Sequence, residues 1–209
     1  MESFLADLVA GLEGEGVRSA ALVHDSEGRS GWAADGQWVM RVPSHGRLLY
    51  APVSPAFPAY LERAIREASP DVLHFHLPNP SAFWALASRA ARRLPWVIHW
   101  HADVLTPESS VLLKMAYRPY RLLEAAMLRR AVTVIATSPD YLRASKPLAP
   151  FIGKCEVIPL GMDDNRLPKA AEEEAQRQAV TGWPEDCTLK MVMIGRFTYY
   201  KGHRVLLDA

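Results

Sequence analysis

The sequence lacks a charge excess of either sign, a long apolar run and any cysteine spacing typical of a metal site or disulfide. Its 24 Lys and Arg residues nearly balance 23 Asp and Glu residues, so charge gives no argument for a nucleic-acid partner. No apolar run approaches the roughly 20 residues that span a bilayer. The acidic start at Glu2 is not typical of a signal peptide. With just two cysteines, Cys155 and Cys187, we expect a protein of the reducing cytoplasm.

What the sequence does have is enough apolar residues, 49%, to build a packed core. Short apolar segments alternate with helical patterns, and this order predicts an α/β fold with a doubly wound, Rossmann-like parallel sheet. Such sheets bind ligands at the carboxyl ends of their strands. Strands are expected at 17–24, 38–42, 47–53, 71–76, 96–101, 132–137 and 155–159, and helices at 3–14, 58–68, 80–93, 109–130 and 139–146. The helix 109–130 is expected to break near Pro119, because proline disrupts a helix interior.

The composition divides the chain into three parts. Residues 1–163 form the predicted domain, and the polar, charged segment 164–187, with a helix near 171–181, is expected to be a linker. Residues 188–209 are expected to begin a second Rossmann-like domain, with a strand at 189–194 and the start of a helix after Gly202. One strand and part of a helix cannot bury a core, and a doubly wound domain normally opens on a strand and a Gly-rich turn. We therefore expect the chain to be cut at both ends.

Four histidines and an aspartate form the most conspicuous polar group: His74, His76, His99, His101 and Asp103. Alternation along a strand places each His-x-His pair on one face. Some of these histidines could be structural core residues. A metal site is a second interpretation, but the sequence lacks the closing histidine of the His-x-His-x-Asp-His pattern of metallo-hydrolases. The third, preferred interpretation assigns His101 and Asp103 to the ligand-facing edge of a cleft, because they follow the end of a strand.

A second group combines Gly195 and Arg196 with Lys201 and Gly202, after an apolar segment. A glycine lets the backbone approach a ligand, and fixed positive charges suit a diphosphate. A helix beginning near Gly202 would add N–H groups to such a site. Surface charge is the alternative explanation.

Two turns carry weaker indications. Gly161 permits a tight turn after a strand, and Asp163 could cap the turn that follows. Ser138 is either a polar ligand contact or a helix cap, and Pro139 at the first helical position favours the cap. A purely structural turn is the alternative at both places.

The segment 114–130 mixes basic and apolar residues. Its cations are Lys114, Arg118, Arg121, Arg129 and Arg130. A basic amphipathic helix can lie on anionic lipid, which would place the protein at the inner face of the membrane. A solvated helix face is the commoner explanation.

Five motifs in order resemble a known family. DVLHFHLPNP, VIHWHAD, VIATSPDYL, KCEVIPLGMD and VMIGRFTYYKG are similar to motifs of the family-4 retaining glycosyltransferases of the GT-B fold. The likeness is greatest to the bacterial branch that builds surface polysaccharide by mannosyl or rhamnosyl transfer. It implies two Rossmann-like domains, the first for the acceptor and the second for the nucleotide sugar.

The resemblance also implies roles for individual residues. His101 matches the family's histidine near the reacting centre of the donor sugar, and Asp103 matches a polar position beside it. Arg196 and Lys201 match the basic pair that grips the donor diphosphate in place of a divalent cation, so no metal or other cofactor is expected. The 161–163 turn matches the one that leads into the linker.

The expected activity is transfer of a hexose, with retention, from a nucleotide sugar such as GDP-mannose to a glycan or lipid-linked acceptor. The Gly-rich turn before the first helix and the late acidic motif of the second domain are absent from this sequence. We therefore expect the 209-residue chain alone to bind donor weakly or not at all and to show no transfer. A nucleotide-sugar epimerase, which would need no acceptor, is the alternative enzyme. A non-catalytic Rossmann-like binding domain and a metal-dependent hydrolase are further alternatives.

Overall fold

The computed structural model describes residues 2–33, 38–48, 51–104, 111–161, 188, 191–195 and 201–209. The chain divides into two compact units, Met1–Gly161 and Met162–Ala209, and each is described by itself. No helix in the described part of the chain is both long and apolar enough to cross a membrane.

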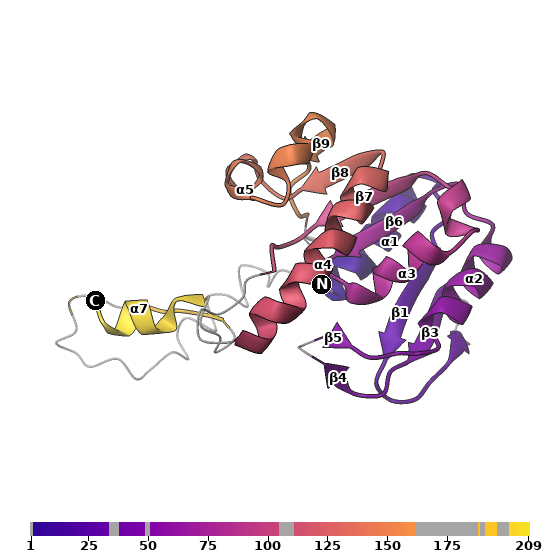
Figure 1. The fold of residues 1–209 in the computed structure, drawn as a ribbon, viewed down its shortest axis with the longest axis horizontal. Helices are drawn as coiled ribbons and strands as arrows, with labels where there is room; N and C mark the ends of the chain where they lie inside the picture. Colours follow the sequence, from indigo (N-terminus) through magenta and orange to yellow (C-terminus); the bar gives the residue numbers. More distant parts are fainter. Residues whose placement is uncertain are drawn as a thin grey trace, which may run out of the picture. The chain divides into compact units, whose positions relative to one another are not determined.

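A four-stranded parallel sheet organises the first unit. Its strands lie in the order β6 (Leu73–Leu77), β7 (Trp96–Trp100), β8 (Thr133–Ala136) and β9 (Cys155–Val157) (Figure 1). These match four of the predicted strands to within a few residues, and the predicted α/β, Rossmann-like class is confirmed. Because all four strands are parallel, their carboxyl ends meet at one edge of the sheet.

A second, mixed sheet precedes it in the chain. Strand β1 (Ala21–Asp25) pairs in parallel with β3 (Val39–Pro43), and β2 (Gly31–Trp32) adds to β3 in the antiparallel sense. The predicted strand 47–53 is instead the two short strands β4 (Arg47–Leu48) and β5 (Ala51–Pro52), which pair antiparallel.

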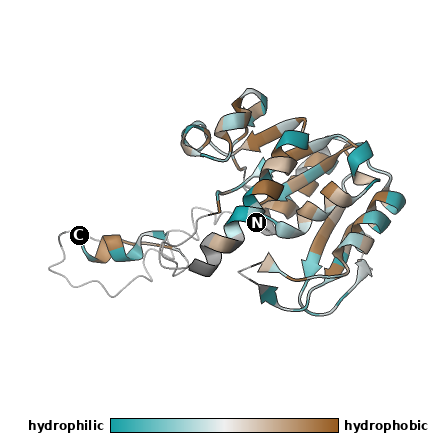
Figure 2. Cartoon of the chain, in the orientation of Figure 1, coloured by the Kyte–Doolittle hydropathy of each residue, from teal (hydrophilic) through white to brown (hydrophobic). Residues whose placement is uncertain are grey.

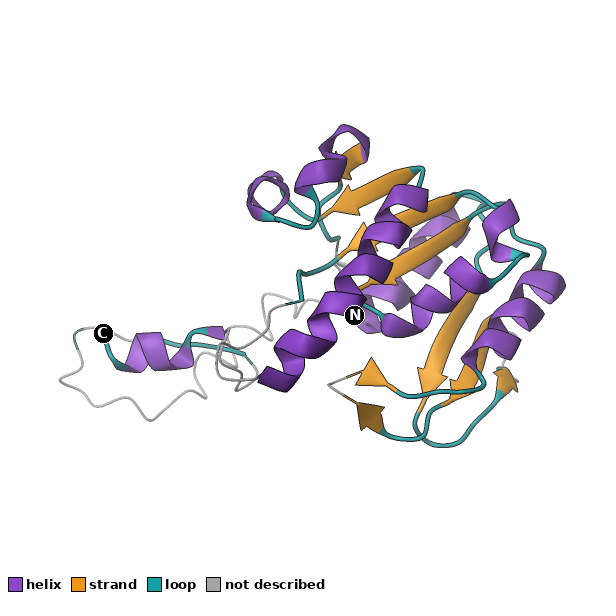
Figure 3. Ribbon diagram, in the orientation of Figure 1, coloured by secondary structure: helices purple, strands orange, loops and turns teal. Residues whose placement is uncertain are grey.

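Helices cover both faces of the parallel sheet (Figure 3). Figure 1 shows α4 (Val111–Arg130) in front of the strands and α1 (Glu2–Gly14) behind them. Helix α2 (Phe57–Ala68) contacts β1 and β3, and α5 (Pro139–Ala144) contacts β8 and β9. The hydrophobic residues run along the strands, whereas the helices carry both hydrophobic and hydrophilic residues (Figure 2).

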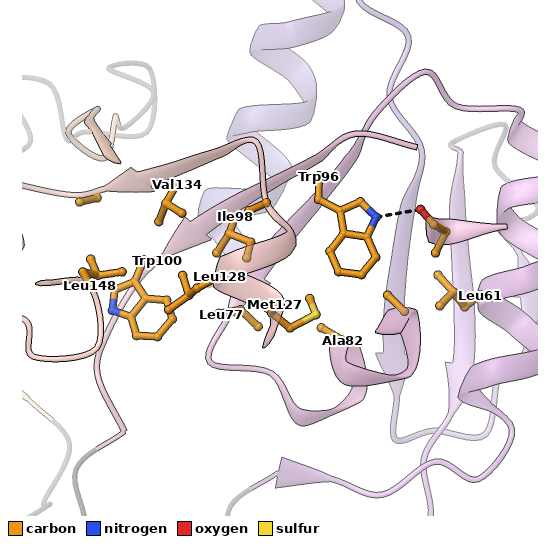
Figure 4. Close-up of a cluster of buried hydrophobic side chains, with 14 of the residues drawn as sticks. Leu61, Leu77, Ala82, Trp96, Ile98, Trp100, Met127, Leu128, Val134 and Leu148 are labelled. Atoms are coloured by element: carbon orange, nitrogen blue, oxygen red, sulfur yellow. Dashed lines mark hydrogen bonds between the residues drawn. The ribbon is translucent and has the colours of Figure 1, made fainter. Parts of the chain in front are cut away.

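The core lies between α4 and one face of the sheet. Alternation sends Trp96, Ile98 and Trp100 of β7 to this face, where they pack with Met127 and Leu128 of α4 (Figure 4). All five are buried. The Trp96 indole donates a hydrogen bond to the Ala91 carbonyl at 2.8 Å, which satisfies its one polar atom inside the core. The histidines of β7 consequently project from the opposite face.

Two helix predictions need correction. The expected helix 80–93 is three short pieces, the 3₁₀ turns η1 (Pro80–Phe83) and η2 (Ala91–Arg93) with α3 (Trp84–Ala87) between them. The Ser88 hydroxyl accepts a hydrogen bond from the Ala91 N–H at 2.9 Å, in competition with a helical backbone partner. The expected break of the long helix near Pro119 is also wrong, because α4 continues through that residue. Proline removes one backbone hydrogen bond, and the buried second half of α4 holds the helix to the sheet.

The second unit is described at residues 188, 191–195 and 201–209. Helix α7 (His203–Leu207) begins directly after Gly202, as predicted. Residues 191–194 are not in a strand, contrary to expectation. A strand requires a pairing partner, and the described residues of this unit contain no other strand. The predicted linker 164–187, with its helix near 171–181, lies outside the described residues and stays a prediction.

Candidate functional site

Four imidazoles stack on the α1 face of the parallel sheet. The register places His76 of β6 opposite His99 of β7, and alternation adds His74 and His101 to the same face. The His99 and His101 rings lie 4.5 Å apart and nearly parallel, and the His76 ring lies 5.2 Å from that of His101. A hydrogen bond of 2.9 Å joins His76 Nδ1 to His101 Nε2. We call His74, His76, His99 and His101 the histidine cluster.

Burial keeps this cluster uncharged. It lowers the pKa of His76 to about 3 and that of His99 to about 4, and the neighbouring imidazoles lower both further. Burial is also the main cause that lowers the pKa of His101 to about 4. All three rings are therefore neutral at pH 7, and in the hydrogen bond between His76 and His101 one ring donates its N–H to the lone pair of the other.

Two members of the cluster have polar atoms without partners. His99 is 3% exposed, and neither Nδ1 nor Nε2 finds a hydrogen-bond partner among the described residues. The same holds for Nε2 of His74 within that part of the chain. An unsatisfied buried polar group lowers the stability of the fold by about 1–3 kcal/mol, so a purely structural role does not explain these histidines.

Helix α1 closes the cluster from the other side. The Phe4 ring meets the His99 and His101 rings edge to face, with centroids 5.0 and 5.4 Å apart, and the His76 ring at 6.0 Å. The positive edge of one ring directed at the face of another is a favourable arrangement. Phe4 lies in the first turn of α1, so this helix contributes directly to the surroundings of His101.

Asp103 anchors the loop that follows β7. Its Oδ1 accepts hydrogen bonds from Trp100 Nε1 at 2.8 Å, the Tyr141 hydroxyl at 2.7 Å and Ser145 Oγ at 2.7 Å. The backbone N–H of Asp103 donates to the same Tyr141 hydroxyl. Burial, and then the hydrogen bond to Asp103, raise the pKa of Tyr141. This network fixes the loop to α5, two residues beyond His101.

A small pocket lies beside this network. Its volume is about 190 Å³, and it is lined by Ala102, Asp103, Tyr141, Ala144 and Ser145. The pocket therefore lies at the carboxyl end of β7, where the strand pattern predicted a ligand. Asp103 and His101 are brought to the same sheet edge, as expected, although the contacts of Asp103 indicate an anchor rather than a reacting group.

Of the two predicted turns, the structure settles the role of Ser138 alone. Ser138 accepts a hydrogen bond from the Tyr141 N–H at 3.1 Å, so its hydroxyl is the N-cap of α5. Gly161 is not in the left-handed region, and an added Cβ would meet nothing within 4 Å. The backbone therefore does not require glycine at position 161, and the turn at 161–163 stays a prediction because residues 162 and 163 lie outside the described residues.

The predicted diphosphate residues belong to the second unit. Arg196 and Asp163 lie outside the described residues. Gly195 and Lys201 are described, and a Cβ added at Gly195 would lie 3.5 Å from the His203 ring. Whether these groups share a cleft with His101 stays a prediction.

Comparison with known proteins identifies the fold family. A model of the glycosyl transferase 4-like domain matches residues 1–161. The chain belongs to this family. It is 32% identical over 144 residues, 68% of its length, to the D-rhamnosyltransferase WbpZ of Pseudomonas aeruginosa. It is 30% identical over 141 residues, 66% of its length, to the O-antigen chain mannosyltransferase C of Escherichia coli. The matches cover 34% of each relative, so the chain spans about a third of their length.

Sequence reasoning missed two features of this glycosyl transferase 4-like domain. Tyr141 and Ser145 were not recognised as partners of Asp103, because they follow it by some 40 residues and nothing local connects them. Glu124 is 2% exposed inside the apolar stripe of α4. Burial, and then the nearby Asp103 carboxylate, raise the pKa of Glu124 to about 7. A lone carboxylate three residues before the buried Met127 was the sequence pattern that could have revealed it.

Proposed function

We propose that this glycosyl transferase 4-like domain is the acceptor-side part of an enzyme that transfers a hexose from a nucleotide sugar to a growing surface polysaccharide. The family match and the two relatives, named as a rhamnosyltransferase and a mannosyltransferase, support this proposal. The single observation that carries it is the position of His101 directly after the carboxyl end of β7, two residues before the anchored Asp103.

The neutrality of His101 suits the chemistry of glycosyl transfer. Cleavage of the bond between sugar and diphosphate develops positive charge on the sugar ring and negative charge on the leaving group. A protonated imidazole would repel the positive sugar, whereas a neutral ring can exchange hydrogen bonds with its hydroxyl groups. Arg196 and Lys201 would supply the fixed positive charge for the diphosphate, so transfer would need no divalent cation.

Retention of configuration is the second part of the proposal. Retaining glycosidases commonly use a carboxylate as nucleophile. Asp103 is the carboxylate nearest to His101 in the chain, and its Oδ1 already accepts three hydrogen bonds, which lowers its nucleophilicity. This favours a reaction on one face of the sugar without a covalent intermediate. GDP-mannose, or a similar donor, is the nucleotide sugar we propose.

We further propose that the exposed face of α4 contacts a lipid surface. Helix α4 exposes Met115 by 67%, Leu122 by 72% and Leu123 by 43%, beside the exposed Arg118 and Arg121. Apolar side chains next to cations are what a helix needs to lie on an anionic membrane. We propose that this face rests on the cytoplasmic side of the membrane and brings a lipid-linked acceptor to the site.

A domain exchange tests the transferase proposal. Residues 1–161 replace the matching segment of the Pseudomonas aeruginosa rhamnosyltransferase, and the chimera is assayed with radiolabelled nucleotide sugar and membrane acceptor. We expect label in the acceptor and none without it. Conversion of the donor in the absence of acceptor would instead favour an epimerase, and a folded chimera that consumes no donor would contradict the proposal.

A further inference from the structure

We propose that His76, His99 and His101 form a binding site for a transition-metal ion of the Zn²⁺ class. The ligand nitrogens of these three residues all lie within 4.8 Å of one another. Nitrogen ligands about 2.0–2.1 Å from a tetrahedral Zn²⁺ lie about 3.3 Å from each other, so these nitrogens must approach one another to close the site. This proposal concerns metal binding itself and does not rest on the transferase assignment.

The strands hold the three ligands in place. His76 and His99 are direct neighbours in the parallel register of β6 and β7, and His101 follows His99 by two residues on the same face. Ligands on paired strands are positioned more firmly than ligands on loops. The stacked rings must rotate about their Cβ–Cγ bonds to direct their lone pairs at one ion.

The unsatisfied ring nitrogens of His99 are an independent argument for a metal ion at this place. Both lie buried without a hydrogen-bond partner in the described part of the chain, and a metal ion would satisfy one of them. Neutral imidazole is a preferred ligand of Zn²⁺, Cu²⁺ and Ni²⁺, whereas hard ions such as Mg²⁺ prefer oxygen.

Three protein ligands leave the fourth tetrahedral position for water or another oxygen ligand. Binding of the ion would break the hydrogen bond between His76 Nδ1 and His101 Nε2, and the ring of His101 would coordinate the ion. Metal binding and a contact between His101 and a sugar would then exclude each other. If the proposed function holds, this consequence follows from it: Zn²⁺ would inhibit transfer rather than serve as a cofactor.

Calorimetric titration of Zn²⁺ into the chelator-treated 209-residue chain tests the site. We expect one ion per chain, and His76→Gln and His101→Gln should each weaken binding more than about tenfold, since even an outer-shell partner is worth that much. His45→Gln, an exposed histidine outside the cluster, is the matched control and should bind as the unchanged chain does. Equal affinity in all four proteins would overturn the site, as would no binding to the unchanged chain.

Co²⁺ provides a second measurement that needs no variant and so remains informative if a substitution unfolds the chain. Bound to three imidazoles in tetrahedral geometry, Co²⁺ gives intense visible absorption, whereas an octahedral ion bound at the surface gives weak absorption. The intense spectrum, abolished by one equivalent of Zn²⁺, is the expected result. A weak octahedral spectrum at saturation would overturn the proposal.

Discussion

Replacing Glu124 by Gln should change how the stability of the chain depends on pH. The carboxyl group is 2% exposed, and its pKa is raised from 4.5 to about 7, chiefly by burial. At about 1.36 kcal/mol per pKa unit, ionisation of Glu124 in the folded chain costs about 3 kcal/mol. Glutamine has nearly the same shape and cannot ionise, so it avoids this cost at every pH.

The direction of this pH dependence follows from the linkage between proton binding and folding. The pKa is higher in the folded chain than in the unfolded chain, so the stabilising contribution of the protonated group is complete below about pH 4.5. It is lost as the pH rises to about 7, because the unfolded chain ionises first. Relative to the unchanged chain, E124Q should therefore gain up to about 3 kcal/mol of unfolding free energy between pH 4.5 and pH 8.

Urea unfolding at several pH values, followed by tryptophan fluorescence, measures this difference. Glu156→Gln, which removes an exposed carboxylate on β9, is the matched control for the loss of one negative charge. Parallel curves of unfolding free energy against pH for E124Q and the unchanged chain would show that Glu124 is not a buried acid, and the reasoning would fail.

Three further predictions concern the Asp103 loop, the α5 cap and the membrane face. Tyr141→Phe removes two hydrogen bonds to Asp103 and should lower the unfolding free energy by about 1–3 kcal/mol in urea; an unchanged midpoint would contradict the anchor. Ser138→Ala should cost about 1 kcal/mol in the same assay and Ser138→Asn much less, because asparagine also caps; equal losses would exclude a capping role. Leu122→Asp should lower the affinity for anionic vesicles, measured by co-sedimentation, by about tenfold or more, because the leucine would no longer be buried in lipid. Unchanged affinity would refute membrane contact through α4.

The positions of the strands of the parallel sheet could be predicted because burial leaves a plain sequence pattern. Segments such as 96–101 are short and rich in apolar and aromatic residues, and the segments between them have helical patterns, so the sequence predicts β6, β7, β8 and β9 to within a few residues. The region 80–93 was harder, because helical propensity there competes with local hydrogen bonds such as that of Ser88. Propensity is a weak guide where a hydroxyl group offers the backbone another partner.

The histidine cluster could be anticipated from the sequence but its contacts could not. Alternation along a strand predicts that the members of each His-x-His pair share a face of the sheet. The role of Asp103 depends on Tyr141 and Ser145, which only the tertiary fold brings near it. Phe4 is a similar case, because an amphipathic helix reveals its buried face without revealing which side chains it will cover.

The most direct test of the account is the effect of His101 on sugar transfer in the chimera that carries residues 1–161. His101→Gln should lower kcat/KM by more than about 100-fold, the usual loss on removing a group that stabilises a transition state, whereas His45→Gln should leave kcat/KM unchanged. Equal kcat/KM values for the two folded variants would contradict the claim that a neutral imidazole at the end of β7 meets the reacting sugar.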